Sequence, residues 1–386
     1  MSSGLHVIAK PIGPACNLKC DYCFYLEKEG LFPERENFRM PDNVLSAFIE
    51  QYIDAQPAGE AEFVWQGGEP TLLGIDFFRK VIDLQHRYKK DRKIRNCLQT
   101  NGVLLNNEWC EFLKKHDVLV GISLDGPKDV HDLYRRDRNG KGSFDRVMQG
   151  LELLKKHDVK CNVLACAAKE TAKKPLEVYR FLKDNGVRYI QFTAVVERES
   201  VSPRSKVAGW TVDPEDYGDF LIGIFDEWIR NDVGKIFVMN FEWALNAWAG
   251  KGAPICIFSQ KCGRSLVIEH NGDVYSCDHY VYPRHKLGNV LETGLKDLAE
   301  LPAQISFGAA KSEKLPSYCR SCRFLFACRG ECPKRRFARS PYGGEGVNYL
   351  CRGYKKYFQH INNTMNRMRE IISQGRPASD IMSIVR

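Results

Sequence analysis

The chain has 386 residues, enough for one large domain and a smaller one, and carries a formal charge of +9. Hydrophobic residues make up 44% and charged residues 27%, as in ordinary globular proteins, and no stretch approaches the roughly 20 apolar residues of a membrane span. The N-terminal stretch lacks the basic and apolar regions of a secretion signal, so we expect a cytoplasmic protein that does not associate with membranes.

An apolar segment, Leu5–Ile12, predicts a first strand and leads directly into three closely spaced cysteines, Cys16, Cys20 and Cys23. Three thiolates on one loop can hold three corners of a cubic four-iron cluster and leave the fourth iron open to a small molecule. A zinc knuckle is the alternative, but structural zinc prefers four protein ligands, and no fourth Cys or His lies close by. The loop therefore favours an iron–sulfur cluster with one open site.

Strand and helix patterns then alternate through six units, which predicts a parallel sheet with right-handed crossovers. Six units fall short of an eight-unit barrel, so the expected fold class is α/β, a partial (β/α)6 barrel, with a doubly wound sheet as the alternative. The expected strands are Leu5–Ile12, Glu62–Gln66, Ile94–Gln99, Val118–Leu124, Val159–Ala167 and Tyr189–Val196. The expected helices are Asp42–Asp54, Phe77–Tyr88, Asn106–Lys115, Ser143–His157 and Leu176–Asn185.

The expected strands end in polar or glycine-rich segments, which would gather on one rim because chemistry sits at the C-terminal strand ends in such folds. These segments are the cysteine loop, Gly67–Pro70, Thr100–Gly102 and Asp125–Pro127. In Gly67–Pro70, glycine backbone and the carboxylate of Glu69 suit an ammonium group, although the segment alone could be a simple turn. A ligand with an amino group and a carboxylate, such as S-adenosylmethionine, could chelate the open iron.

After Glu197 the alternation stops, and we expect residues 1–235 to form the barrel and 236–386 a cysteine-rich domain. Helical patterns cover Tyr217–Arg230 and Phe241–Trp248, and a basic helix is expected at Tyr354–Ile372. Two short apolar runs, Leu266–His270 and Val274–Cys277, flank an Asn-Gly turn and predict a hairpin.

Eight of the 15 cysteines lie in this second region, enough for two fully ligated four-iron clusters or for two four-cysteine zinc sites. They are Cys256, Cys262, Cys277, Cys319, Cys322, Cys328, Cys332 and Cys351. Four others occupy apolar segments and are interpreted as small buried hydrophobic residues, namely Cys97, Cys110, Cys161 and Cys166.

The positive charge is concentrated at the end of the chain, where Cys319–Arg386 holds 14 Lys or Arg and 4 Asp or Glu. A basic segment can bind nucleic acid, but no basic motif interleaved with aromatic residues accompanies this one. We expect it instead to offset an anionic cluster or to dock an acidic electron donor, such as a flavodoxin or ferredoxin.

The spacing of Cys16, Cys20 and Cys23, with Tyr22 before the last cysteine, and the segment Gly67–Pro70 resemble the radical S-adenosylmethionine enzymes. In that family the cluster cleaves the cofactor to a 5′-deoxyadenosyl radical, which abstracts a substrate hydrogen. The resemblance implies the three cysteines as cluster ligands. It implies as cofactor contacts Tyr22, Gly67, Gly68, Glu69, Ser123, Arg135 and Val196.

The later cysteines resemble the SPASM-type extension of radical enzymes that modify peptides and proteins. That resemblance implies three four-iron clusters in all, with interleaved ligation of the last two. One would take Cys256, Cys262, Cys277 and Cys332, and the other Cys319, Cys322, Cys328 and Cys351. These clusters would carry electrons or only shape the peptide groove, and the sequence leaves both interpretations open.

From Lys10-Pro11 to the last cysteine the chain resembles the anaerobic sulfatase-maturating enzymes, including the run Cys277-Asp278-His279-Tyr280. These oxidise a Cys or Ser in an unfolded sulfatase segment, Cys/Ser-x-Pro/Ala-x-Arg, to Cα-formylglycine. The resemblance implies Asp278 as the catalytic base, because the thiol or hydroxyl must lose a proton, and Tyr25 and Gln66 as substrate contacts. A solvated turn aspartate is the alternative interpretation of Asp278.

Two other functions remain open at this point. Thioether cross-linking, epimerisation and quinone-cofactor maturation use the same cysteine-rich extension, so the cysteines do not separate them from sulfatase maturation. A zinc-dependent scaffold would explain the late cysteines but not the segment Gly67–Pro70 beside an open three-cysteine loop.

Overall fold

The computed structural model describes residues 4–32, 38–200, 205–252, 254–263 and 265–385. It divides into two compact units. Unit 1 comprises Met1–Ser123, Arg135–Cys161 and Cys262–Ala309, and unit 2 comprises Leu124–Tyr134, Asn162–Lys261 and Ala310–Arg386. The predicted domain boundary at residue 235 stays a prediction. None of the described helices is long and apolar enough to cross a membrane.

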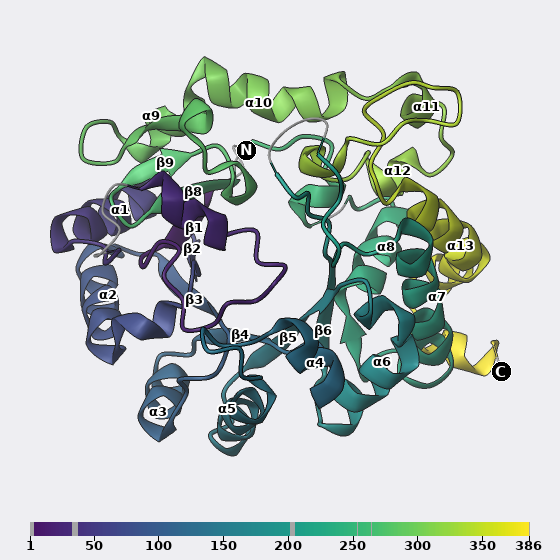
Figure 1. Cartoon of the computed structure of the whole chain (residues 1–386), viewed down its shortest axis with the longest axis horizontal. Coiled ribbons are helices and arrows are strands. Elements are labelled where there is room, and N and C mark those ends of the chain that lie inside the picture. The colour runs from purple at the N-terminus through teal and green to yellow at the C-terminus, as the bar shows by residue number, and fades with distance from the viewer. Residues whose placement is uncertain (1–3, 33–37, 201–204, 253, 264, 386) are drawn as a thin grey trace. The chain divides into compact units, whose positions relative to one another are not determined.

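Four parallel strands with their helices form the first part of unit 1, as the alternation predicts (Figure 1). Their register pairs Ile8 with Val64 and Trp65 with Leu98. Each helix buries one apolar side, and α3 begins where Asn106 Oδ1 accepts from the Trp109 N–H. The strands are β1 (His6–Lys10), β2 (Glu60–Trp65), β3 (Lys93–Thr100) and β4 (Leu119–Ser123). The helices are α1 (Asp42–Ala55), α2 (Ile75–Tyr88), α3 (Asn107–Lys115) and α5 (Phe144–Lys156).

The predicted late hairpin is confirmed, and it belongs to the same sheet as β1. Strand β8 (Ser265–Glu269) pairs antiparallel with β9 (Asp273–Tyr275), which pairs with β10 (Lys286–Asn289). On its other edge β8 pairs in parallel with β1, so that Lys10 and Glu269 are register partners. Figure 1 shows β8 and β9 beside β1. Segments about 260 positions apart in the sequence are therefore neighbours in one sheet.

Unit 2 holds the last two predicted strand–helix units and a short further strand, all in parallel. The predicted basic helix is confirmed as α13 (Cys351–Ser373), which packs on α7 (Pro214–Asn231). The two helices approach closely because Gly218 faces Gly353, where an added Cβ would lie 1.8 Å from Pro214 O. The other elements are β5 (Cys161–Ala167), β6 (Tyr189–Ala194), β7 (Phe237–Val238), α6 (Pro175–Asp184) and α8 (Met239–Trp248).

Several helices were not predicted. They are α4 (Lys128–Tyr134), α9 (Leu295–Glu300), α10 (Pro302–Glu313), α11 (Ser317–Arg320) and α12 (Leu325–Cys328). All but α10 are too short to show an apolar period, and α10 does not gather its apolar residues on one side.

The prediction of four buried core cysteines is partly wrong. Only Cys110 among them is fully buried, while Cys97, Cys161 and Cys166 are partly exposed. These three lie on β3 and β5, where side chains point alternately to opposite faces, and they occupy the less buried positions of that alternation.

Candidate active site

The three cysteines of the opening loop follow β1. The Leu18 N–H donates to Cys16 Sγ at 3.3 Å, and Asn101 Nδ2 lies 3.8 Å from the same sulfur. Burial raises the pKa of the Cys16 thiol to about 12, whereas these two donors favour its thiolate form. A sulfur supplied with N–H donors suits a thiolate ligand, so the chemistry of this loop fits an iron–sulfur cluster.

The glycine-rich segment after β2 lies directly against the cysteine loop. The Gly68 N–H donates to Gly13 O at 2.7 Å, and the Glu69 N–H donates to Ala15 O at 2.9 Å. A Cβ on Gly68 would lie 1.8 Å from Ala15 O. Gly67 has a φ of +144°, which residues other than glycine rarely adopt. The structure thus brings together the two motifs that the sequence singled out.

The carboxylate of Glu69 is fully buried and ties two strand ends together. Its Oε1 accepts from the Thr71 N–H, the Thr71 hydroxyl and the Thr100 hydroxyl at 3.0, 2.6 and 2.7 Å. Its Oε2 accepts from the Asn101 N–H at 2.7 Å. Burial raises the pKa of Glu69, while these four hydrogen bonds lower it. The predicted contact with a cofactor ammonium stays a prediction, for which Oε2 retains a lone pair.

Three further predicted cofactor contacts lie in unit 1 and are nearly buried. Ser123 ends β4, and its hydroxyl accepts from Gln99 Nε2 at 3.1 Å. The Arg135 guanidinium lies 5.4 Å from the centre of the Tyr22 ring, a cation–π arrangement that places Arg135 beside the cysteine loop. The remaining predicted contact, Val196, is buried in unit 2, just after β6.

Two buried residues, Lys10 and Glu269, contact the predicted substrate residues Tyr25 and Gln66. Neither Lys10 nor Glu269 was predicted as a site residue from the sequence. Lys10 Nζ donates to Gln66 Oε1 at 3.2 Å and lies 4.3 Å from the centre of the Tyr25 ring. The Tyr25 hydroxyl donates to Glu269 Oε1 at 2.5 Å. Lys10 and Glu269 are 1% and 0% exposed. A charged residue at the end of an apolar strand was the only available signal for either.

Asp278 follows Cys277 directly and begins a single helical turn. The Cys277 thiol donates to Asp278 Oδ1 at 3.3 Å. Burial opposes ionisation of this carboxyl, but the charges of His279 and Lys10, together with hydrogen bonds from Cys277 and the His279 N–H, lower its pKa to about 2. Asp278 is therefore a carboxylate at neutral pH, which is the protonation state that a base requires. Burial lowers the pKa of Lys10, and the charge of Asp278 opposes that lowering.

Four late cysteines line one cavity of about 20 Å³ in unit 2. Aromatic rings and one ammonium complete its wall, and burial raises the pKa of Cys328 while Cys351 adds to the rise. Among the described residues, no three His, Cys, Asp or Glu side chains converge closely enough to hold a single metal ion. The four are those predicted to share one cluster, Cys319, Cys322, Cys328 and Cys351.

The other predicted set is divided between the units. Cys332 and Cys256 belong to unit 2 and lie within electrostatic range of each other, whereas Cys262 and Cys277 belong to unit 1. Their common ligation stays a prediction.

Glu331, which precedes Cys332, is the centre of a buried network in unit 2 that the sequence did not indicate. Its carboxylate accepts from the Cys332 N–H at 2.6 Å and from Arg335 at 2.9 Å. Arg335 also donates to Ala194 O at 2.7 Å, at the end of β6. The loop of Cys332 is thereby anchored to the strand that precedes Val196.

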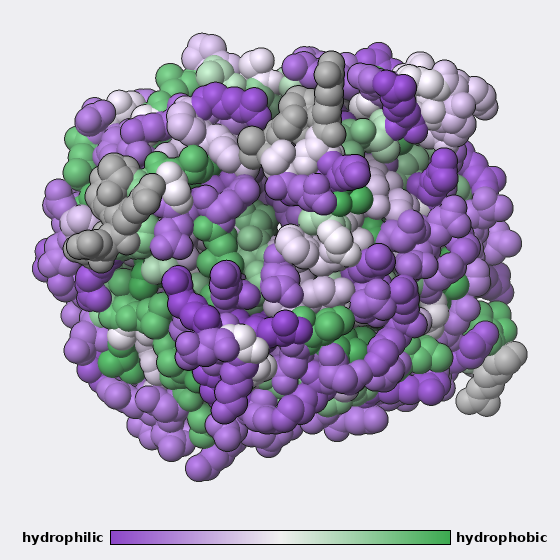
Figure 2. Space-filling view, viewed as in Figure 1, coloured by the Kyte–Doolittle hydropathy of each residue, from purple (hydrophilic) through white to green (hydrophobic). Residues whose placement is uncertain are grey.

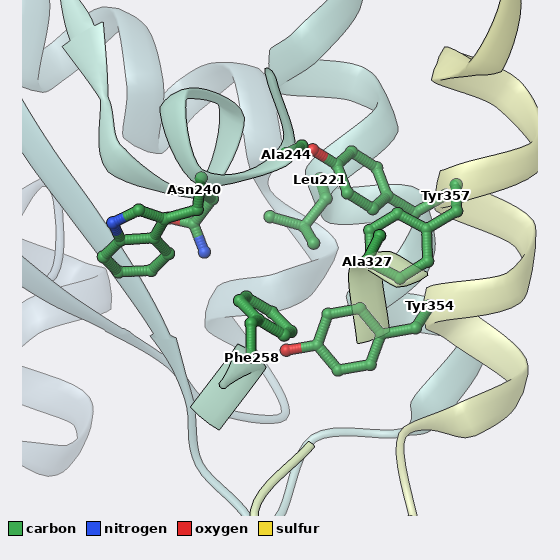
Figure 3. A pocket seen from close by; sticks show the side chains of 9 residues that line it. Leu221, Asn240, Ala244, Phe258, Ala327, Tyr354 and Tyr357 are labelled. Atoms are coloured by element: carbon green, nitrogen blue, oxygen red, sulfur yellow. The ribbon is translucent and has the colours of Figure 1, made fainter. Parts of the chain in front are cut away.

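A separate small cavity of about 10 Å³ lies among α7, α8 and α13 and contains no predicted site residue. Figure 3 shows that Phe258, Tyr354 and Tyr357 face it, so it is part of the aromatic core of unit 2. On the face shown in Figure 2, hydrophilic residues predominate, with hydrophobic residues between them.

Two family models match the chain. The radical SAM superfamily matches residues 11–194, and the SPASM iron–sulfur cluster-binding domain matches residues 256–323. These matches imply iron–sulfur clusters and S-adenosylmethionine as the cofactors.

Curated relatives cover nearly the whole chain. A serine-type anaerobic sulfatase-maturating enzyme of Bacteroides thetaiotaomicron is 44% identical over 97% of this chain and 94% of its own. A cysteine-type enzyme of Clostridium perfringens is 32% identical over 92% of this chain and 96% of its own. The solved structure of native anSMEcpe with bound AdoMet and Cp18Cys peptide matches with a TM-score of 0.86 at 32% identity, covering 95% of this chain and 99% of that one. This likeness confirms the predicted partial barrel with a cysteine-rich extension.

Proposed function

The chain belongs to the anaerobic sulfatase-maturating enzymes of the radical SAM superfamily, and we propose that it oxidises a side chain of a sulfatase to Cα-formylglycine. The observation that carries the proposal is the 44% identity with a serine-type enzyme along 97% of the chain. A serine-type enzyme of Klebsiella aerogenes is 38% identical, above the 32% of the cysteine-type relative. The substrate is accordingly a segment of the form Ser-x-Ala-x-Arg, or its Cys-x-Pro-x-Arg counterpart.

Three cysteine sets hold three four-iron clusters under this proposal. Cys16, Cys20 and Cys23 form the first set and would hold a cluster with one open iron, the site that would bind S-adenosylmethionine. The second set is Cys256, Cys262, Cys277 and Cys332. The third is Cys319, Cys322, Cys328 and Cys351, which is supported by the cavity that these four side chains line.

Residues at the rim of unit 1 would hold most of the cofactor. Gly67 and Gly68 present backbone without side chains, and Glu69 keeps that segment in place. Ser123 and Arg135 would hold the polar ends of the cofactor, with the Tyr22 ring beside Arg135. In unit 2, Val196 would contact the adenine.

Bound S-adenosylmethionine supplies the radical that removes a hydrogen atom from Cβ of the target residue. Asp278 accepts the proton of the target hydroxyl or thiol, for which its carboxylate is already ionised. As a cluster ligand Cys277 would be a thiolate without a proton to donate, so that its hydrogen bond to Asp278 Oδ1 would be lost. Tyr25 and Gln66 hold the peptide. The net change would be the loss of one hydrogen atom to the 5′-deoxyadenosyl radical, one proton to Asp278 and one electron to a fully ligated cluster. For a Cys target, hydrolysis of the resulting thioaldehyde would then release sulfide and give the aldehyde.

The electron that starts each turnover comes from an acidic carrier such as a flavodoxin or ferredoxin. The excess of Lys and Arg after Cys319 supports this choice, because opposite charges bring such partners together.

Anaerobic reconstitution with iron and sulfide should give about twelve irons per chain, four for each cysteine set. Replacing Cys319 and Cys322 by Ala removes ligands from one set and should lower the iron content by about a third. Cys110→Ala, a core cysteine outside the sets, serves as the control and should retain all the iron. Colorimetric iron analysis and visible absorption measure the result. Stoichiometric zinc without a brown chromophore would contradict the proposal.

Incubation with a Ser-x-Ala-x-Arg peptide, dithionite and S-adenosylmethionine should yield a peptide lighter by two hydrogen atoms, detected by mass spectrometry. The aldehyde should then react with a hydrazide probe. A Cys-x-Pro-x-Arg peptide under the same conditions measures the preference, which we expect to favour Ser. Cofactor cleavage without any change in either peptide would point to a different peptide modification and overturn the proposed function.

A further inference from the structure

Lys10 contacts both residues that the family resemblance assigns to the substrate. Its ammonium donates to Gln66 Oε1 at 3.2 Å and lies 4.3 Å from the Tyr25 ring. It is 1% exposed, and a lysine is rarely fully buried in a protein unless its charge is paired with another group. No hydrogen bond other than that to Gln66 engages the Lys10 ammonium within the described part of the chain, although an ammonium carries three N–H donors.

The contact with Lys10 determines the orientation of the Gln66 carboxamide. An ammonium can only donate, so the Gln66 atom that faces it must be the carbonyl oxygen Oε1. The amide nitrogen Nε2 therefore points away from Lys10, and within the described residues it has no hydrogen-bond partner. Gln66 thus keeps two N–H donors available at the end of β2, beside the cysteine loop.

We propose that Lys10 is a positioning residue for the substrate: it fixes Gln66 as a hydrogen-bond donor, so that the peptide must present an acceptor oxygen to Gln66 Nε2. The acceptor is a backbone carbonyl or the target hydroxyl. This inference rests on the proposed function, because it requires that a peptide occupy the site. Glu269, the register partner of Lys10, accepts the hydrogen bond of the Tyr25 hydroxyl, so each of the two peptide contacts is held by a buried polar side chain.

A double-mutant cycle on peptide binding tests the proposal. The reconstituted protein, with S-adenosylmethionine and no reductant, is titrated with a fluorescent Ser-x-Ala-x-Arg peptide, and anisotropy gives the Kd. Lys10→Met and Gln66→Ala should each weaken binding about tenfold, the loss of one hydrogen bond. The double variant should bind no more weakly than Gln66→Ala, because Lys10 acts through Gln66. An additive loss of about a hundredfold, or an unchanged Kd for Lys10→Met, would overturn it.

Gln66→Glu tests the donor assignment itself. Glutamate keeps the size and gains an ion pair with Lys10, but it has no N–H to offer, so we expect it to bind the peptide as weakly as Gln66→Ala. Wild-type affinity for this variant would contradict the assignment. Lys80→Met removes an exposed lysine of the same unit and should leave the Kd unchanged. Iron content and thermal unfolding verify that each variant is folded. If the wild-type protein binds no peptide at all, the proposed function fails rather than this inference.

Discussion

Replacing Asp278 with Asn should lower formylglycine formation by about 10²- to 10⁴-fold, the usual contribution of a general base. Asparagine has the same shape as aspartate but cannot accept a proton, so the target hydroxyl would keep its proton after the hydrogen atom has been removed. The charges of His279 and Lys10 that keep Asp278 ionised would then have no anion to stabilise. Initial rates of peptide oxidation by mass spectrometry measure the effect.

Two readouts separate this role from a structural one. Iron content and cofactor cleavage in Asp278→Asn should remain near those of the unaltered protein, because the side chain at this position is not a proposed cluster ligand. Asp76→Asn changes an exposed aspartate of the same unit and should leave the rate unchanged. Undiminished peptide oxidation by Asp278→Asn would remove the assigned role. A parallel loss of iron would instead show that the residue supports the adjacent Cys277.

Gly68→Ala should abolish both activity and the iron of the opening loop. The added Cβ would lie 1.8 Å from Ala15 O and 2.8 Å from the Pro14 carbonyl carbon, so the backbone itself must move. That movement would break the hydrogen bonds from Gly68 to Gly13 and from Glu69 to Ala15, which hold the rim against the cysteine loop. Reconstituted Gly68→Ala should contain about four irons fewer per chain, measured by colorimetric analysis.

Gly30→Ala is the matched control, because no atom lies within 4 Å of the Cβ that it adds. It should retain full iron content and wild-type peptide oxidation. Chemical denaturation then compares the free energy of unfolding of the two variants, which should fall only for Gly68→Ala. A Gly68→Ala protein with full iron and unchanged activity would show that the loop and the rim are not coupled as the structure indicates.

Sequence reasoning located the opening cysteines and the glycine segment because both are local. Cys16, Cys20 and Cys23 are close in sequence and therefore share one loop in any fold of the chain. The alternation of strands and helices predicts that Gly67 follows a neighbouring strand. The hydrogen bond from Gly68 to Gly13 agrees with that expectation. The family resemblance alone predicted that four late cysteines share a cluster. In the structure, the side chains of these four cysteines line one cavity.

The sequence by itself therefore determined the strand–helix alternation, the cysteine loop and the residue types that chemistry at the rim requires. Only the tertiary structure decided that β8 pairs with β1, which makes Glu269 the register partner of Lys10 and brings both to Tyr25 and Gln66. The pairing joins strands about 260 residues apart, and their register depends on which side chains fit together in the assembled sheet. No local period in the sequence records that choice.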